Sequence, residues 1–477
     1  MAASSKLRRE KIYSEATLLG QKNMTHLEQH LKTKRCRAAS TRRRKVRREF
    51  KLRYPEKGWE RKRTSKPNKD ITTCVKNNRD SRYTYQQNMI TKKVPGQRIN
   101  IMNQQKEAPF TRRALERVSE ANSEEYEFSI VTYNILADYW ILQNSWKEDS
   151  YSYCPKEYMI RTKGRASHRH ILLMAELRWL DSDIICLQEV DTSYFREILK
   201  GDLSELGYEG LFAEKCMGIP EGEALFFKKN KFHLQETKTV HLNDMAECTF
   251  KQAEIPQFWE VVLLATLRHK LSNSLLVLCV THIRWGNLQE TVSQACQITM
   301  VTKALYDMVS TLQESQGNRV AYILCGDFNI EPQFPAYKLL AEGKLTDKEI
   351  NTLKGCDYIR WGSDTYMEKA LQLSPDQVAL LHRTEAQINN PLVDLQSAYK
   401  NIMGAEPRCT NHEGPECLWT LDYIWFDSRS LEVTAALETV SPSAIEPYTG
   451  LPNEYFPSDH LSLKAYFKFA SSREKQE

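Results

Sequence analysis

Asp327 and Asn329 are residues whose types and spacing suit chemistry. They follow the apolar run Ala321–Cys325, which predicts a buried strand. Two residues separated by one point to the same side of a strand. A carboxylate can hold a metal ion or accept a proton from water, and an amide can donate a hydrogen bond to a phosphoryl oxygen. The pair therefore suits phosphate chemistry, although Gly326–Asn329 also has the composition of an ordinary turn.

Other predicted strands carry polar residues of the same kinds at or near one end. Glu189 follows the apolar run Ile184–Leu187 and one glutamine, a position where a carboxylate is rarely buried unless it is paired or bound to metal. Asn134 and His282 lie at the ends of their strands, Asp422 lies near the start of its strand, and Asp459 and His460 precede the last strand. Together they form the inventory of a hydrolase that cleaves phosphoesters with a hard metal ion.

Taken singly, each of these residues also has a structural explanation. Asn134 suits a turn that closes its strand, His282 a hydrogen-bonded core histidine, and Asp422 a salt bridge. Asp459 and His460 suit a capping pair ahead of the last strand. The functional interpretation requires that these distant strand ends meet in space.

The elements that would position them alternate between strands and helices. Helical spacing of apolar residues predicts helices over His170–Leu180, Tyr194–Leu206 and about Gln289–Leu312. A polar region, roughly Glu342–Asn390, contains helical patches that the pattern does not place. The predicted strands are Phe128–Ala137, Asp183–Val190, Glu223–Lys228, Val261–Leu267, Leu275–Ile283, Ala321–Cys325, Thr420–Phe426 and Lys464–Phe469. These runs are too apolar for one-sided exposure, which predicts an α/β fold with sheets stacked face to face and helices outside.

Composition indicates an intracellular globular chain. The hydrophobic content of 41% suffices for a sizeable core. No apolar run approaches the roughly 20 residues of a membrane span, and the N-terminus lacks the apolar region of a secretory signal. The 12 cysteines contain no Cys-x-x-Cys pair, which predicts reduced thiols and no zinc site.

The net charge of +6 hides a division of the chain. Residues 1–120 hold 33 basic and 11 acidic residues, a net of +22, whereas the remainder holds 34 basic and 50 acidic residues. Poor apolar periodicity predicts a largely disordered basic arm over 1–121, followed by a catalytic domain over 122–472. The arm suits nucleic-acid contact or nuclear import, and a passive solvated tail is the alternative. Glu10, Glu15 and Glu28 argue against a mitochondrial presequence.

Six short motifs occur in one order along this domain. They are Tyr133–Asn134, Leu187–Val190, Val280–His282, Cys325–Asn329, Leu421–Ile424 and Pro457–Leu461. In this order they resemble the endonuclease/exonuclease/phosphatase family of DNase I-like fold. Within it, the chain is most similar to the branch that contains deadenylases, nocturnin, angel and the 2′,5′-phosphodiesterases. Three stretches look most like nocturnin: Glu223–Phe227, Thr420–Trp425 and Tyr455–His460.

The resemblance implies a four-layer α/β/β/α sandwich and phosphoester cleavage that depends on Mg²⁺, with Mn²⁺ as a substitute. Glu189 would be the principal metal ligand, with Asn134 beside it. Asp459 would complete the metal shell through water. A magnesium ion keeps several waters and uses one or two carboxylates, which agrees with a single glutamate.

The resemblance also implies roles for the other strand-end residues. His460, oriented by Asp422, would act together with Asp327 on the attacking water. His282 and Asn329 would hold the phosphoryl oxygens. A buried Asp–His pair favours the imidazolium, which suits the charge that develops on phosphorus. Which group is the general base stays open.

Two loops depart from the deadenylase pattern. The loop after His282 is brief and carries Arg284 and Trp285, which suit a phosphate contact and base stacking or simple packing against the next helix. The segment Arg408–Thr420 replaces an aromatic-rich run. Both loops help deadenylases grip adenines, so a preference for poly(A) does not follow.

The predicted function is that of a Mg²⁺-dependent 3′-exoribonuclease located in the nucleus, the cytoplasm or both. The substrate would be RNA or a nucleotide, with no membrane partner. Alternatives are a phosphatase that removes the 2′-phosphate of NADP, a 2′,5′-phosphodiesterase, and an inactive RNA-binding scaffold.

Overall fold

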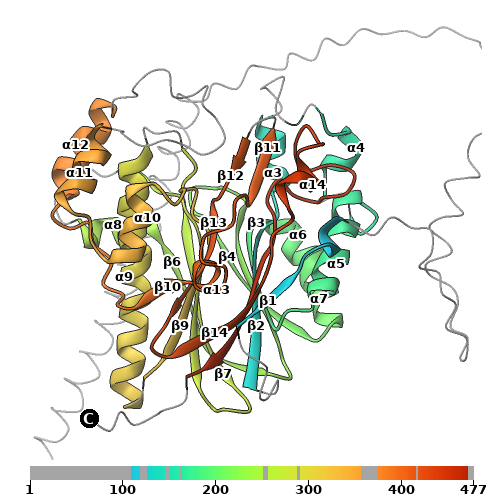
Figure 1. Ribbon diagram of the computed structural model, residues 1–477, viewed down its shortest axis with the longest axis horizontal. Coiled ribbons are helices and arrows are strands. Elements are labelled where there is room, and N and C mark those ends of the chain that lie inside the picture. The colour runs from blue at the N-terminus through green and yellow to red at the C-terminus, as the bar shows by residue number, and fades with distance from the viewer. Residues whose placement is uncertain are drawn as a thin grey trace, which may run out of the picture. The chain divides into compact units, whose positions relative to one another are not determined.

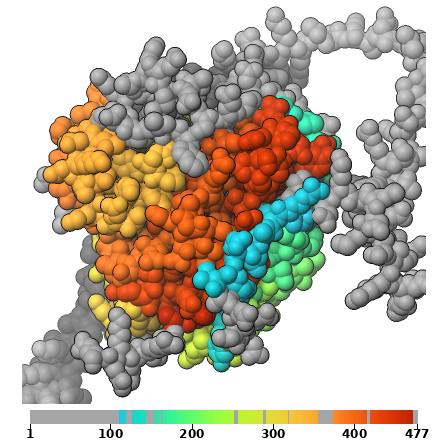
Figure 2. Space-filling model, viewed as in Figure 1, coloured from blue at the N-terminus to red at the C-terminus, as the bar shows by residue number. Residues whose placement is uncertain are grey.

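The computed structural model describes residues 109–118, 126–144, 151, 153–161, 164–250, 256–286, 290–317, 319–355, 373–414 and 417–470. The predicted basic arm lies outside the described residues except for 109–118. These ten residues include a short 3₁₀ helix, η2 (Pro109–Thr111), and strand β1 (Leu115–Arg117). Strand β1 pairs antiparallel with β14 (Leu431–Leu437), so the folded part of the chain begins before Tyr126. Figure 2 shows this N-terminal segment lying against the C-terminal segment.

One sheet has seven strands in the order β1-β14-β15-β2-β3-β5-β4. Strands β2 and β3 are parallel, so their C-terminal ends lie at the same edge. Besides β1 and β14, its strands are β2 (Glu127–Asn134), β3 (Ile184–Asp191), β4 (Tyr208–Glu214), β5 (Glu221–Lys228) and β15 (Leu463–Phe469).

The second sheet has six strands in the order β10-β13-β9-β8-β7-β6. Its parallel pair is β8–β9. The strands are β6 (Phe232–His241), β7 (Val261–His269), β8 (Leu275–His282), β9 (Ala321–Asp327), β10 (Leu395–Ser397) and β13 (Asp422–Asp427). A separate hairpin consists of β11 (Asn411–Gly414) and β12 (Cys417–Trp419).

Helices cover the outer face of each sheet (Figure 1). Helices α8 (Leu242–Thr249), α9 (Thr291–Gln316), α10 (Pro335–Glu342) and α12 (Pro375–Thr384) pack on the six-stranded sheet. On the seven-stranded sheet lie α5 (His168–Leu180) and a continuous helical segment made of α6 (Thr192–Tyr194), the π-helix η4 (Phe195–Leu199) and α7 (Lys200–Glu205). The remaining helices are α3 (Asp138–Asn144), α4 (Lys156–Met159), α11 (Asp347–Gly355), α13 (Ala398–Met403) and α14 (Pro442–Ile445).

The two sheets pack face to face through a core of alternating strand residues. Ile184 and Cys186 of β3 meet Leu278 and Val280 of β8 in this layer, and all four are fully buried. Burying one such aliphatic side chain contributes about 1.5–3 kcal/mol, so this layer is a main source of stability. The predicted four-layer α/β/β/α sandwich is confirmed.

The apolar pattern of the sequence did not predict the strands that contain many polar residues. Strand β6 is an edge strand with mostly exposed side chains, and its segment Gln235–Thr239 is polar. An edge strand lacks a neighbour on one side, so polar residues are tolerated there. Of the polar region that the pattern left unplaced, α11 and α12 are described and 356–372 lies outside the described residues. No described helix has the length and apolarity needed to cross a membrane.

Candidate active site

The predicted site residues lie where strands of both sheets end, on the faces that enclose the inter-sheet core. Along β9, Ile323 and Cys325 belong to this core, and Asp327 continues their alternation. Along β8, Val280 is followed at the same parity by His282. By the two-residue alternation of a strand, Asp327 and His282 therefore lie on the same face as the apolar core residues and form a polar cluster at the end of the inter-sheet layer.

Glu189 reaches this cluster only because β3 departs from regular alternation. Ile185 and Leu187 face the helices, so regular pleating would turn Glu189 away from the other sheet. A bulge lies between Leu187 and Val190, and Glu189 has a φ of 55°. Bulges re-aim side chains, and a left-handed conformation is unfavourable for a glutamate, so the fold stabilises a strained backbone at this position.

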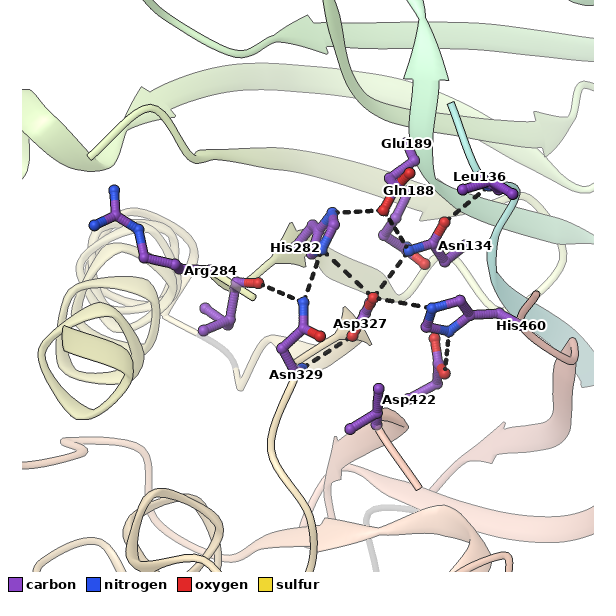
Figure 3. Close-up of polar contacts among 12 residues, drawn as sticks. Asn134, Leu136, Gln188, Glu189, His282, Arg284, Asp327, Asn329, Asp422 and His460 are labelled. Carbon is purple, nitrogen blue, oxygen red and sulfur yellow. Dashed lines mark hydrogen bonds and ion pairs between the residues drawn. The ribbon is translucent and has the colours of Figure 1, made fainter. Parts of the chain in front are cut away.

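Asn134 joins the two carboxylates of the cluster across the sheets (Figure 3). Its side-chain nitrogen donates to Glu189 Oε1 at 3.0 Å and to Asp327 Oδ2 at 2.9 Å. Its side-chain oxygen accepts from the backbone N–H of Leu136 at 2.9 Å. Glu189 Oε2 accepts a further bond from the N–H of Ala137 at 2.9 Å. One oxygen of Glu189 is thus held by the last residue of β2, and the other by the segment that follows it.

Asn329 lies beyond the end of β9 and has a φ of 50°, so it does not share a strand face with Asp327. The predicted reason for their proximity was therefore wrong. A turn brings them together instead, because the Asn329 N–H donates to Asp327 Oδ1 at 2.9 Å. The Asn329 side-chain nitrogen then donates to His282 Nε2 at 2.9 Å and to the carbonyl of Ile283 at 2.9 Å.

His460 is held between two carboxylates. Its Nδ1 lies 2.8 Å from Asp422 Oδ2, and its Nε2 lies 3.5 Å from Asp327 Oδ2. Burial lowers the pKa of His460, but the charges of Asp422 and Asp327 outweigh it and raise the pKa well above its ordinary value. These surroundings therefore favour the imidazolium form, and Asp422 fixes the orientation of the ring.

His282 is the opposite case. Burial, Lys215 and the charge of His460 lower its pKa well below the ordinary value, so its ring is neutral. The pKa values of two imidazoles in one site are thus shifted in opposite directions. The neutral ring accepts from Asn329, and the charged ring can donate to an oxyanion.

Burial also acts on the carboxylates. It raises the pKa of Asp327 to about 7 against the opposing charge of His460. Burial and the charge of Asp459 raise the pKa of Glu189, against the charge of Lys215 and the hydrogen bonds from Asn134 and Ala137. A nearby cation would stabilise the charged form of carboxylates that are buried in this way.

The donor set fits a hard divalent cation. Ligand atoms of Glu189, His282 and Asp327 lie within 4.8 Å of one another, and so do those of Asp327, Asp422 and His460. Carboxylate oxygens are the ligands that Mg²⁺ prefers. Asp459 belongs to neither group, and its Oδ2 accepts from the hydroxyl of Tyr151 at 2.8 Å.

Arg284 and Trp285 lie in the loop that follows β8. The guanidinium of Arg284 extends away from the cluster (Figure 3) and contacts Glu260 at 3.1 Å and the carbonyl of Gln257 at 2.8 Å. It also stacks on the ring of Trp259, 4.3 Å from its centroid. Trp285 is 56% exposed.

Sequence reasoning missed a buried charged group beside the cluster. Lys215 Nζ lies 2.6 Å from Glu221 Oε1 and 3.3 Å from His282 Nδ1. Glu221 and Glu223 of β5 are both fully buried, and Trp140 donates its indole N–H to Glu221 at 3.2 Å. Two glutamates directly ahead of Ala224–Phe227 could have been noticed, because carboxylates are rarely buried in strands.

Comparison with known proteins places these residues in a family context. Residues 131–460 match the Endonuclease/Exonuclease/phosphatase family. The chain is 26% identical over 394 residues to the CCR4-Not complex 3′-5′-exoribonuclease subunit Ccr4 of Aspergillus niger, covering 76% of this chain and 54% of the relative. It is 29% identical over 342 residues to nocturnin of Mus musculus, covering 68% of this chain and 62% of that protein. The chain thus spans little more than half the length of these curated relatives.

The fold comparison agrees with this family. The crystal structure of ANGEL2, a 2′,3′-cyclic phosphatase, in complex with adenosine-2′,3′-vanadate matches with a TM-score of 0.57 and 24% sequence identity. The match covers 75% of this chain and 98% of that chain. At this identity the similarity supports the sandwich fold alone.

Proposed function

Because the chain belongs to the endonuclease/exonuclease/phosphatase family, as its match over residues 131–460 shows, we propose that it is a Mg²⁺-dependent phosphoester hydrolase that shortens RNA from the 3′ end. One observation carries the proposal. Around Asp327, at the end of β9, lie side chains from the ends of β2, β3, β8 and β13 and from the segment before β15. An exoribonuclease relative, Ccr4, supports the choice of RNA.

The metal would be held chiefly by Glu189, with Asn134 and Asp459 as the other proposed members of its shell. A bound divalent cation would neutralise charge on the phosphoryl oxygens and help to ionise water. Asn134 keeps Glu189 and Asp327 on opposite sheets at a fixed separation, since one amide nitrogen donates to both. The protein therefore holds the ligands in place before the substrate binds.

The remaining residues act on the substrate and on water. Asp327 would accept or direct the proton of the attacking water, and His460 would donate to a phosphoryl oxygen as negative charge grows. The strong pairing of His460 with Asp422 keeps the ring charged and oriented. Asn329 and His282 would complete the cradle for the phosphoryl group. Hydrolysis breaks one P–O bond and adds water, which yields an alcohol and a phosphate with one more ionisable oxygen.

Trp285 is the proposed contact for a base, because it is exposed in the loop next to His282. Base stacking on an aromatic ring contributes about 1–3 kcal/mol per base. Arg284, committed to Glu260 and Trp259, would support this loop; its predicted contact with phosphate would require that it leave Glu260.

The test uses the full chain and single-stranded RNA with a labelled 5′ end. Mg²⁺ should produce a ladder of shortened products, and Glu189→Gln should abolish it. Glu236→Gln, at an exposed position of β6, is the matched control and should retain activity. Undiminished cleavage by Glu189→Gln would refute the assignment.

A second candidate is removal of the 2′-phosphate of NADP, which the similarity to nocturnin brings into consideration. A parallel assay on poly(A), mixed RNA, 2′,5′-linked oligoadenylate and NADP separates the candidates. Release of free phosphate from NADP with intact RNA would select the phosphatase. Binding of RNA without turnover of any substrate would select the inactive scaffold.

The basic arm would raise affinity for RNA and direct the chain to the nucleus. Residues 109–118 belong to the folded domain, so the informative deletion is 1–105. Loss of these residues should weaken RNA binding and flatten its salt dependence. An unchanged salt dependence, with unchanged localisation, would make the arm a passive tail.

A further inference from the structure

The cationic side chains of the active site and its adjoining loop are already paired with carboxylates. Lys215 contacts Glu221 at 2.6 Å, His460 contacts Asp422 at 2.8 Å, and Arg284 contacts Glu260 at 3.1 Å. The pair Lys215–Glu221 is the most deeply placed, because the exposed fractions of the two side chains are 2% and 0%. A cation paired in this way offers a substrate much less positive potential than a free one.

The Lys215–Glu221 pair adjoins the reaction centre. Lys215 Nζ is 3.3 Å from His282 Nδ1, and His282 Nε2 is 3.4 Å from Asp327 Oδ2. The indole N–H of Trp140 donates to the same Glu221 oxygen, Oε1, that Lys215 contacts. Two donors therefore fix Glu221 Oε1, and the lysine cannot turn to a substrate without separating from this oxygen.

The charge on a substrate depends on its class. A phosphodiester carries one negative charge, whereas a terminal phosphate carries about 1.5–2 near neutral pH because its second pKa is about 6. To bind a terminal phosphate, the site would need an unpaired cation that balances this additional negative charge. The additional charge would also lie close to Glu189 and Asp327, whose own charges oppose it.

We infer that Glu221, by neutralising Lys215, makes this site select phosphodiesters over terminal phosphate monoesters. The inference rests on the proposed hydrolase function and specifies its substrate class. Both reactions have the same balance: water adds to phosphorus and one P–O bond breaks. A diester yields an alcohol and a monoester, and a monoester yields an alcohol and inorganic phosphate. Specificity then depends on the charge that the site tolerates.

Glu223 provides a matched control on the same strand. Like Glu221 it is a fully buried glutamate, but neither of its carboxylate oxygens has a hydrogen-bond partner among the described residues. Burial raises its pKa well above the ordinary value, against the opposing charge of Lys215. Glu223→Gln therefore changes the same kind of side chain and leaves the ion pair between Lys215 and Glu221 in place.

The test compares kcat/KM on two RNA oligonucleotides of identical sequence. One ends in a free 3′-hydroxyl and is scored by cleavage of its last diester, and the other carries a 3′-phosphate and is scored by release of inorganic phosphate. The wild type should prefer the diester. Glu221→Gln should shift the ratio toward the monoester by roughly tenfold, the size expected from freeing one partly screened charge. Glu223→Gln should leave the ratio unchanged, and Glu221→Gln combined with Lys215→Gln should lose the shift.

The outcomes separate the inference from the proposed function. Diester cleavage by the wild type with the same ratio in Glu221→Gln would overturn the inference and leave the function intact. A shift that persists without Lys215 would also overturn it. Absence of diester cleavage in the wild type would overturn the proposed function itself. Circular dichroism and a thermal melt establish that each variant is folded.

Discussion

Replacing Glu189 by glutamine tests the metal site independently of any substrate. In the protein without metal, the Glu189 carboxylate is largely buried, its side chain being 12% exposed, and its pKa is raised by burial and by Asp459. Glutamine keeps the shape of the side chain and can still accept from Asn134 or Ala137. It removes the charge that a divalent cation would neutralise. We therefore expect Glu189→Gln to raise the stability of the metal-free protein and to abolish its response to Mg²⁺.

The size of the response follows from binding to the native state alone. A ligand present at 100 times its Kd stabilises the folded protein by about 2.7 kcal/mol. For domains of about 150–250 residues, 1 kcal/mol corresponds to roughly 2–4 °C in Tm, and the larger domain here responds at the low end or below. The wild type should therefore gain several degrees when Mg²⁺ is added after treatment with a chelator.

The assay is a thermal melt of the wild type, Glu189→Gln and the exposed control Glu236→Gln, each with chelator and with a series of Mg²⁺ concentrations. The control should follow the wild type. Glu189→Gln should melt at or above the metal-free wild type and stay constant across the series. A variant that keeps the wild-type increase in Tm would refute Glu189 as the principal ligand.

Three further predictions concern other parts of the domain. Arg169 is fully buried, and its guanidinium donates to the carbonyls of Ile135, Leu136, Met159 and Pro457. Arg169→Met should therefore lower the free energy of unfolding by about 3–5 kcal/mol in urea denaturation. Arg165→Met, at an exposed position, should change it little. Asp183 is partnered by Lys231, Ser129 and Lys228, which together outweigh burial and lower its pKa below the unfolded value. The resulting stabilisation is present above the unfolded pKa of about 3.9 and is lost as pH falls through the folded pKa. Asp183→Asn should therefore flatten the acid limb of the pH–stability curve, and an unchanged limb would contradict this. Trp285→Ala should weaken RNA binding by about 1–3 kcal/mol in a fluorescence titration. Tyr306→Ala, which changes a partly exposed aromatic residue of α9, should not weaken it. Equal affinities of the wild type and Trp285→Ala would show that this loop does not contact the substrate.

Several features of the site could be predicted from the residues alone. Apolar runs that end in Asp327 and His282, and the run that follows Asp422, specify buried strands with polar ends. Their parity puts those side chains on the inter-sheet face. The order of the six motifs indicated the sandwich, which the structure confirms. These inferences succeed because they depend on local alternation and burial, which are written in neighbouring residues.

Other features depend on which strands become neighbours. The bulge that turns Glu189 into the cluster arises from its pairing with β5, and regular alternation would have pointed that side chain at the helices. Strand β1 is recognisable only beside β14, because its three residues are exposed and have no apolar pattern. Lys215, Glu221 and Arg284 acquired their roles from partners that only the folded chain supplies.

The sequence by itself therefore determined the kinds of chemical groups and the faces on which most of them lie. The tertiary structure decided which charges are paired and which backbone is strained. The physical reason is that alternation along a strand is fixed by the local backbone, whereas the distance between two charges on different strands depends on register, twist and sheet packing.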